Sequence, residues 1–355
     1  MTTLFDPVSL GEMSLANRII MAPMTRSRAG AGDVPLDLHV EYYRQRASAG
    51  LIISEGTQPS LVGKGYCRTP GIHSAEQVEA WKKVTDAVHE AGGRIAVQIM
   101  HVGRVANSLN KGEGVDTVAP SAIRARGKIY TEAGMMPLDE PRALETDEIP
   151  ALVKEFAVAT ENALKAGFDG VELHCTSGYL PAQFLSSGSN HRTDAYGGSA
   201  ANRIRFVVEV IEAMVAVAGA GRIGFRICPG NPFNDIHDDN PAETYGLLIR
   251  TLAPMNLAYL HLVNLANDQV DSLALVKENW RGPLILNESI SFEQGQQLVG
   301  DGTADAISFG RPYIANPDLV ERFRAGAPLA EFSLSKLYTD GPEGFIDYPP
   351  MTVDA

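Results

Sequence analysis

The stretch HCTSGYL, residues 174–180, follows the apolar run GVEL and includes His174, Ser177 and Tyr179, whose side chains can donate hydrogen bonds. An imidazole such as His174 can donate to an oxygen that gains negative charge, and a serine such as Ser177 can add a second donor. A phenol such as Tyr179 stays protonated at neutral pH and can deliver a proton. The stretch therefore leaves two interpretations open: a hydrogen-bond donor and a proton donor placed at a strand end for chemistry, or ordinary core and turn residues.

An arginine inside an apolar run is the next unusual feature. Arg226 lies within GFRICP, and a buried guanidinium needs an anionic or electron-rich partner. An ion pair with Glu172 would satisfy it, and so would a bound ligand. The later stretches NESIS (287–291) and FGRPYIANPDL (309–319) combine glycine, arginine and polar residues, which is typical of a phosphate site but also of a turn with a solvated arginine.

The elements that must position these residues alternate between β-rich runs and amphipathic helical stretches. Such alternation is typical of parallel βα units, and eight units in 355 residues predict a (β/α)8 TIM barrel, with its site at the carboxyl ends of the strands. The expected strands are 19–23, 51–56, 95–101, 170–174, 223–229, 257–263, 284–289 and 306–311. The expected helices are 37–49, 75–91, 147–167, 200–217, 241–254, 270–280, 291–300 and 316–325.

One long segment has no clear element of its own. Residues 103–145 follow the third strand and are rich in Gly, Asn, Pro and charged residues. Because loops of this length in compact domains are usually functional, we expect a lid-like excursion within a single domain that spans residues 1–355.

Composition excludes several classes of protein. The net charge of −13 disfavours binding to nucleic acid and to anionic membranes, and no apolar run is long enough for a membrane span. Three scattered cysteines form no disulfide framework or metal motif, and the first residues show no secretory signal, so a cytoplasmic protein without a metal is expected. GAGRIG (219–224) matches a dinucleotide motif but follows a helix and precedes a strand, which is the reverse of the required order.

Several longer blocks lie along nearly the whole chain. They are NRIIMAPMTRSRA (17–29), EYYRQRASAGLIISEGT (41–57), QIMHVGR (98–104), HCTSGYLPAQFLSSGSNHRTDAYGGSAANRIRF (174–206), FGRPYIANPDL (309–319) and GFIDYP (344–349). Taken together, these blocks resemble the old yellow enzyme family. They run in the family's order, which makes the resemblance more specific than any single motif.

The resemblance implies an FMN-dependent NAD(P)H oxidoreductase. FMN would bind noncovalently in a (β/α)8 barrel, NADPH or NADH would reduce it, and the hydride would pass from flavin N5 to an activated C=C bond in an enone, maleimide or nitroalkene. A nitrate-ester or nitroaromatic reductase with the same flavin site is the alternative, and a flavin- or ligand-binding scaffold without turnover is a third interpretation. A monomer or homodimer is expected.

The resemblance also implies a role for individual residues at the cofactor. Pro23, Met24 and Thr25 would face the flavin ring, and Thr25 would place the chain with the branch that resembles yeast and enterobacterial members. Gly56 and Gln98 would bond the pyrimidine edge of the ring, and Arg226 would lie near N1. The phosphate would be held by Glu288, Ser289, Gly310 and Arg311.

At the substrate, His174 would donate a hydrogen bond to the carbonyl or nitro oxygen and Tyr179 would supply the proton. Tyr66 and Tyr338 would line the substrate site. Ser177 departs from the Asn or His usual in the family, so its shorter arm is expected to weaken binding of ligands that need two donors. Met100 replaces a Trp common in relatives, which predicts a wider site there or neutral repacking.

Overall fold

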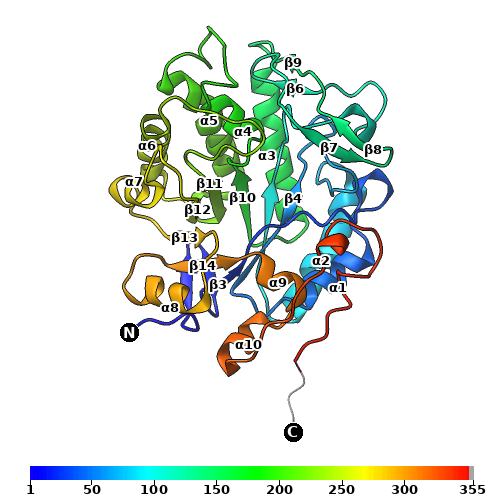
Figure 1. Ribbon diagram of the computed structural model, residues 1–355, viewed down its shortest axis with the longest axis vertical. Coiled ribbons are helices and arrows are strands. Elements are labelled where there is room, and N and C mark those ends of the chain that lie inside the picture. The colour runs from blue at the N-terminus through cyan, green and yellow to red at the C-terminus, as the bar shows by residue number, and fades with distance from the viewer. Residues whose placement is uncertain (352–355) are drawn as a thin grey trace.

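Eight parallel strands close into a barrel, as the alternation of elements predicts (Figure 1). The computed structural model describes residues 1–351, and within them every expected strand is present. In chain order the barrel strands are β3 (Ile19–Met21), β4 (Leu51–Thr57), β5 (Ile95–Ile99), β10 (Gly170–His174), β11 (Ile223–Ile227), β12 (Tyr259–Val263), β13 (Leu284–Asn287) and β14 (Ala306–Phe309). The barrel closes where β14 pairs with β3.

The expected helices follow their strands and surround the barrel. Several end earlier than expected; the stretch 37–49, for example, is helical only through Arg44. They are α1 (Asp37–Arg44), α2 (Ala75–Glu90), α3 (Ile149–Lys165), α5 (Ala200–Ala218), α6 (Pro241–Leu252), α7 (Ser272–Asn279), α8 (Phe292–Gly300) and α10 (Leu319–Ala325). Ser74 and Ser291 begin α2 and α8 with reciprocal capping boxes to Gln77 and Gln294, which explains why these two starts are readable in the sequence.

Two short helices were not expected. They are α4 (Leu180–Leu185), directly after the stretch HCTSGYL, and α9 (Arg311–Ala315), directly after β14. Both are too short to show a helical period. Both have proline in the first turn, but longer helices share this feature, so it does not mark a short helix. Single helical turns of the 3-10 type occupy Ala31–Asp33, Ser108–Asn110, Ala220–Arg222, Ala253–Met255 and Leu334–Lys336.

Alternation along the strands separates two apolar layers. In β3, Ile19 and Met21 pack outward against helices, whereas Ile20 belongs to a second cluster inside the barrel. The other strand residues of this inner cluster are Leu51, Ile53, Ala96, Tyr259, Ile285 and Ala306. Gly224 is required there, because a Cβ at this position would lie 2.3 Å from the Tyr259 ring. The inside of the barrel is therefore a packed core at this level and not a channel.

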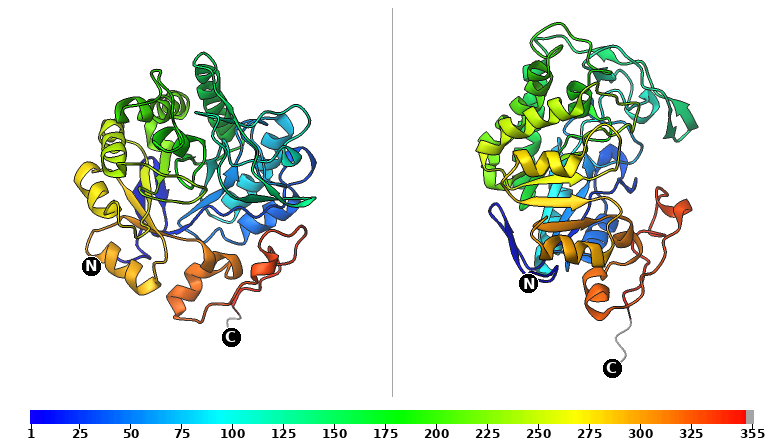
Figure 2. Two further views of the ribbon diagram at one scale, coloured as in Figure 1. Left: turned by 45° about the horizontal axis from the view of Figure 1, so that its top comes forward. Right: turned by 60° about the vertical axis from the view of Figure 1, so that its left-hand side comes forward.

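A hairpin at the start of the chain covers the amino end of the barrel. Strands β1 (Val8–Leu10) and β2 (Met13–Leu15) pair antiparallel, and Leu10, Met13 and Leu15 join the inner cluster. The right-hand view of Figure 2 shows this hairpin in dark blue at one end of the barrel. We call it the floor hairpin.

The segment between β5 and α3 forms small sheets of its own. Strands β7 (Lys128–Thr131) and β8 (Gly134–Pro137) make an antiparallel hairpin, while β6 (Val118–Ala119) and β9 (Arg142–Ala143) form a short parallel pair. The β7–β8 hairpin projects beside the barrel, at the end away from the floor hairpin (Figure 2).

Residues 329–345, here called the strap, run across the same end of the barrel as the β7–β8 hairpin (Figure 2). Arg28 holds the strap with five hydrogen bonds, to the carbonyl oxygens of Lys336, Leu337, Gly341 and Glu343 and to Thr339 Oγ1, and it donates a sixth to the carbonyl of Arg26 in its own loop. Arg26 donates further bonds to the carbonyls of Leu337 and Gly344.

Over residues 1–351, no helix has the length and apolar character needed to cross a bilayer.

Candidate active site

Two adjoining cavities lie at the carboxyl ends of the strands. The inner cavity has a volume of about 950 Å³ and extends between the barrel and the strap. The outer cavity, of about 790 Å³, extends between the strap and the β7–β8 hairpin. Thr25, Leu334 and Tyr338 line both, so the two volumes meet at these side chains.

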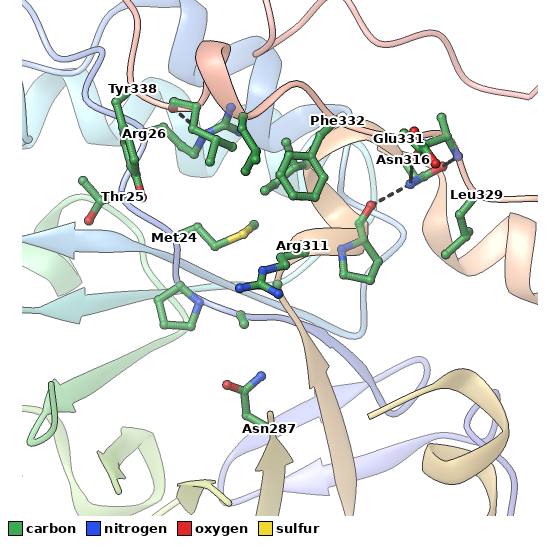
Figure 3. A pocket seen from close by; sticks show the side chains of 18 of the residues that line it. Met24, Thr25, Arg26, Asn287, Arg311, Asn316, Leu329, Glu331, Phe332 and Tyr338 are labelled. Carbon is green, nitrogen blue, oxygen red and sulfur yellow. Dashed lines mark hydrogen bonds between the residues drawn. The ribbon is translucent and has the colours of Figure 1, made fainter. Parts of the chain in front are cut away.

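The loop after β3 and the loop after β14 form one wall of the inner cavity. Pro23, Met24 and Thr25 line it from the first loop, and Gly310 and Arg311 from the second; their contacts with the cofactor remain predictions. In Figure 3 the Arg311 side chain lies between Met24 and the Asn287 amide, with Phe332 of the strap across from them. A cavity with an apolar wall and cationic side chains at one end suits a flat, largely apolar molecule that bears an anionic group.

Arg226 provides a direct test of whether an anionic cofactor fits. Its Nη2 donates to Asn287 Oδ1 at 2.6 Å, and its buried Nε has no partner among the described residues. Glu172 does not pair with it; that carboxylate accepts hydrogen bonds from Gln98 Nε2 (2.7 Å) and from His261 Nδ1 (2.8 Å). The guanidinium thus faces the inner cavity with unused donors, and the residues present fit FMN.

Four predicted cofactor residues do not line the inner cavity. Gln98 uses its amide on Glu172, and Gly56 packs against Met100, where a Cβ would lie 2.6 Å from the sulfur. Glu288 and Ser289 are exposed turn residues with left-handed backbone at φ 101° and 51°. Their roles at the cofactor remain predictions.

The phenols of Tyr66 and Tyr179 meet in the outer cavity. Their hydroxyl oxygens are 3.0 Å apart, and the rings cross edge to face at 6.3 Å. Burial, together with the neighbouring Tyr66, raises the pKa of Tyr179 well above its usual value. Tyr179 is therefore protonated at neutral pH, as a proton donor must be.

His174 stands beside this tyrosine pair at the end of β10. Its ring packs edge to face on Tyr179, with ring centres 4.9 Å apart. Its Nδ1 accepts a hydrogen bond from the backbone N–H of Thr176 at 3.4 Å, so the ring proton is on Nε2. Burial and the positive charge of Arg226 lower the pKa of His174 well below its usual value, which leaves a neutral imidazole with a free N–H donor.

The remaining predicted substrate residues differ in where they lie. Tyr338 is on the strap and lines both cavities. Met100 is buried in a cluster with Tyr179 and lines neither cavity. Ser177 also lines neither; it has a left-handed backbone at φ 57°, and its carbonyl accepts from Asn234 Nδ2 at 2.7 Å.

Two kinds of functional residue escape sequence reasoning. Asn287, the first residue of the stretch NESIS, ends β13 and orients Arg226, a role that its position at a strand end did not reveal. Phe332 and Leu337 reach the inner cavity only because the strap folds back over it, and no local pattern announces that return.

Comparison with a family model and with known proteins gives matches over nearly the whole chain. The model of the NADH:flavin oxidoreductase / NADH oxidase family matches residues 3–330. The chain is 40% identical to a probable flavin mononucleotide-dependent alkene reductase of Leishmania infantum, over 98% of this chain and 97% of that protein. It is 39% identical to 12-oxophytodienoate reductase 1 of Oryza sativa subsp. japonica, over 98% and 92% of the two chains.

Solved structures of similar proteins also superimpose on nearly the whole chain. The old yellow enzyme homologue from Zymomonas mobilis superimposes with a TM-score of 0.96 at 42% identity, covering 99% of this chain and 100% of the other. Morphinone reductase in complex with tetrahydroNAD gives a TM-score of 0.95 at 45% identity, covering 99% of both chains.

Proposed function

The chain belongs to the NADH:flavin oxidoreductase / NADH oxidase family, the old yellow enzyme family, and is an FMN-dependent oxidoreductase; on that premise we propose that it reduces activated C=C bonds. The acceptors would be enones, maleimides and nitroalkenes, with NADPH or NADH as reductant. The observation that carries this proposal is the packing of a neutral N–H donor, His174, against a protonated phenol, Tyr179, which lines the outer cavity.

The two side chains complement each other chemically. His174 Nε2–H donates to the carbonyl or nitro oxygen of the acceptor and stabilises the negative charge that develops there. Tyr179 delivers its proton to the α-carbon, and Tyr66, at 3.0 Å, can share the charge left on the phenol oxygen.

The walls of the inner cavity would hold the cofactor. When bound, FMN supplies the hydride for the β-carbon of the acceptor. Arg226 and Arg311 offer positive charge to its anionic groups, and Thr25 offers a hydroxyl where the two cavities meet.

Replacing Tyr179 with Phe tests the proton-donor role. We expect the rate of alkene reduction in stopped flow to fall about 100-fold or more, because general-acid catalysis contributes 10²–10⁴-fold. Reduction of the cofactor by NADPH or NADH should stay within about threefold of wild type, since it needs no proton from this phenol. Tyr66→Phe is the matched control, because it removes the partner hydroxyl but leaves Tyr179 in place.

A Tyr179→Phe enzyme that reduces cyclohexenone at the wild-type rate would remove Tyr179 from the mechanism. A wild-type protein that takes up no FMN would refute the enzyme altogether.

The position of Ser177 favours a second candidate acceptor. Neither Ser177 nor His174 lines a cavity, but the His174 ring packs on Tyr179, which lines the outer cavity, so of the two predicted oxygen donors His174 is the one that lies beside the reacting groups. Acceptors that need less activation, such as nitrate esters and nitroaromatics, would then react better. Comparing kcat/KM for cyclohexenone and for a nitrate ester separates the two candidates.

A further inference from the structure

A buried carboxylate lies inside the barrel that neither the proton transfer nor the cavity walls use. Glu172 is on β10, two residues before His174, and is fully buried. It belongs to a layer of inward-pointing polar side chains between the apolar core above the floor hairpin and the inner cavity. The hydrogen-bonded members of this layer are Gln98, Glu172, His261 and Ser308.

The hydrogen bonds in this layer provide the donors that a charged carboxylate needs. The His261 Nε2 atom is 2.8 Å from Ser308 Oγ, whose proton it can accept, so Nδ1–H donates to Glu172 Oε2 at 2.8 Å. Gln98 Nε2 donates to the other oxygen at 2.7 Å. Although burial raises it, these donors and the positive charge of Arg226 bring the pKa of Glu172 below its usual value.

Arg226 is the cation that this carboxylate faces. Glu172 is in register with Gly224 of β11, and two residues further along, His174 is in register with Arg226. Two residues of a strand span about 6.6 Å, so the carboxylate lies roughly one side-chain layer below the guanidinium. The two groups form no ion pair within 4 Å in the part of the chain that the structure describes, and Arg226 is free to turn its donors to the cavity.

We propose that Glu172 is a positioning residue that sets how strongly the site favours reduced over oxidised FMN. The inference rests on FMN binding in the inner cavity. At neutral pH the bound ring gains two electrons and one proton on reduction, hence one net negative charge. Arg226 stabilises that charge, and the carboxylate one layer below offsets part of the stabilisation, so the pair keeps the cofactor reducing enough to pass its hydride on.

Glu172→Gln tests this by removing the charge while keeping the shape. A unit charge about 10 Å from the reduced ring, at an effective dielectric constant of about 20, changes the binding equilibrium of the reduced cofactor roughly tenfold. We therefore expect the ratio of affinities for reduced and oxidised FMN to rise roughly tenfold, which is a midpoint potential about 30 mV more positive for a two-electron couple. Anaerobic titration against a reference dye, followed by flavin absorbance, measures this without any acceptor.

Ser308→Ala is the matched control. It removes a hydrogen bond from the same buried layer but no charge, and we expect it to change the ratio less than twofold. If Glu172→Gln does not fold, the double variant Glu172→Gln/His261→Gln, in which two amides can pair, carries the same test.

A Glu172→Gln protein with the wild-type potential would overturn the inference, and so would an equal shift in Ser308→Ala. Neither result would bear on alkene reduction, which is tested separately at Tyr179.

Discussion

At the scale of the residue, the site depends on which side chains keep a free donor. His174 is neutral and has its proton on Nε2, because Nδ1 is occupied by the backbone N–H of Thr176. Arg226 has donors to spare because Glu172 is satisfied by other partners. The residue types were readable in the sequence, but the partners of Glu172 were not, because they lie on strands that are 74 and 89 residues away along the chain.

Ser177 gives a prediction at this scale. We expect Ser177→Asn to bind phenols at least about fivefold more tightly, since the longer amide arm can add a second donor to a ligand oxygen. Asparagine also tolerates the left-handed backbone at φ 57° better than serine does. Titration of FMN-loaded enzyme with 4-hydroxybenzaldehyde, followed by the charge-transfer band, gives the affinity.

Ser177→Gly is the control for backbone effects, because glycine accepts the same φ without any side-chain donor. It should bind phenols as the wild type does. Unchanged phenol affinity in Ser177→Asn would show that this position does not reach the ligand.

At the scale of the element, the strap closes the inner cavity and is held by the loop that lines it. Arg26 follows Thr25 directly and Arg28 lies two residues further on, so the loop that faces the cavity also anchors the strap. Arg28 packs over the Phe345 ring at 4.6 Å, which fixes the plane of its guanidinium. The sequence predicted the barrel elements because a period of two or 3.6 residues is local. It could not predict the strap, whose partners are backbone carbonyls about 310 residues away from Arg28.

Arg28→Met should loosen the strap. Losing several charge-assisted hydrogen bonds should cost about 2–3 kcal/mol of strap closure. We expect faster amide hydrogen exchange within residues 329–345, faster loss of FMN on dilution and a higher KM, with kcat within about threefold of wild type.

The exposed Arg324, which covers Phe5 on the outside of the molecule, provides the control variant Arg324→Met. Hydrogen exchange in the strap that is as slow in Arg28→Met as in Arg324→Met would contradict the anchoring role.

At the scale of the whole molecule, buried neutral histidines make stability depend on pH. Burial, with the positive charge of Lys111, lowers the pKa of His101 to about 3. The unfolded chain takes up this proton near pH 6.5 but the folded chain does not, so stability is full above pH 6.5 and falls as the pH drops toward 3. The slope is about 1.4 kcal/mol per pH unit for each such histidine.

His101→Asn should remove one such contribution. The amide oxygen can replace Nδ1 as acceptor for the Gly103 N–H and does not titrate. Between pH 7 and pH 4.5 we expect the free energy of unfolding in urea to fall by about 2–3 kcal/mol less in the variant than in wild type. Equal losses in the two proteins would show that His101 takes up its proton in the folded state. His39 titrates in both proteins, so it cancels from the comparison.

The floor hairpin has a practical consequence for attaching the enzyme to surfaces. Ser9 lies exposed on β1, at the end of the barrel away from both cavities, while Cys67, Cys175 and Cys228 are all buried. A thiol introduced as Ser9→Cys would thus be the accessible one for maleimide coupling among residues 1–351. An electrode or bead attached there would hold every molecule in one orientation, with its catalytic mouth turned toward the solution.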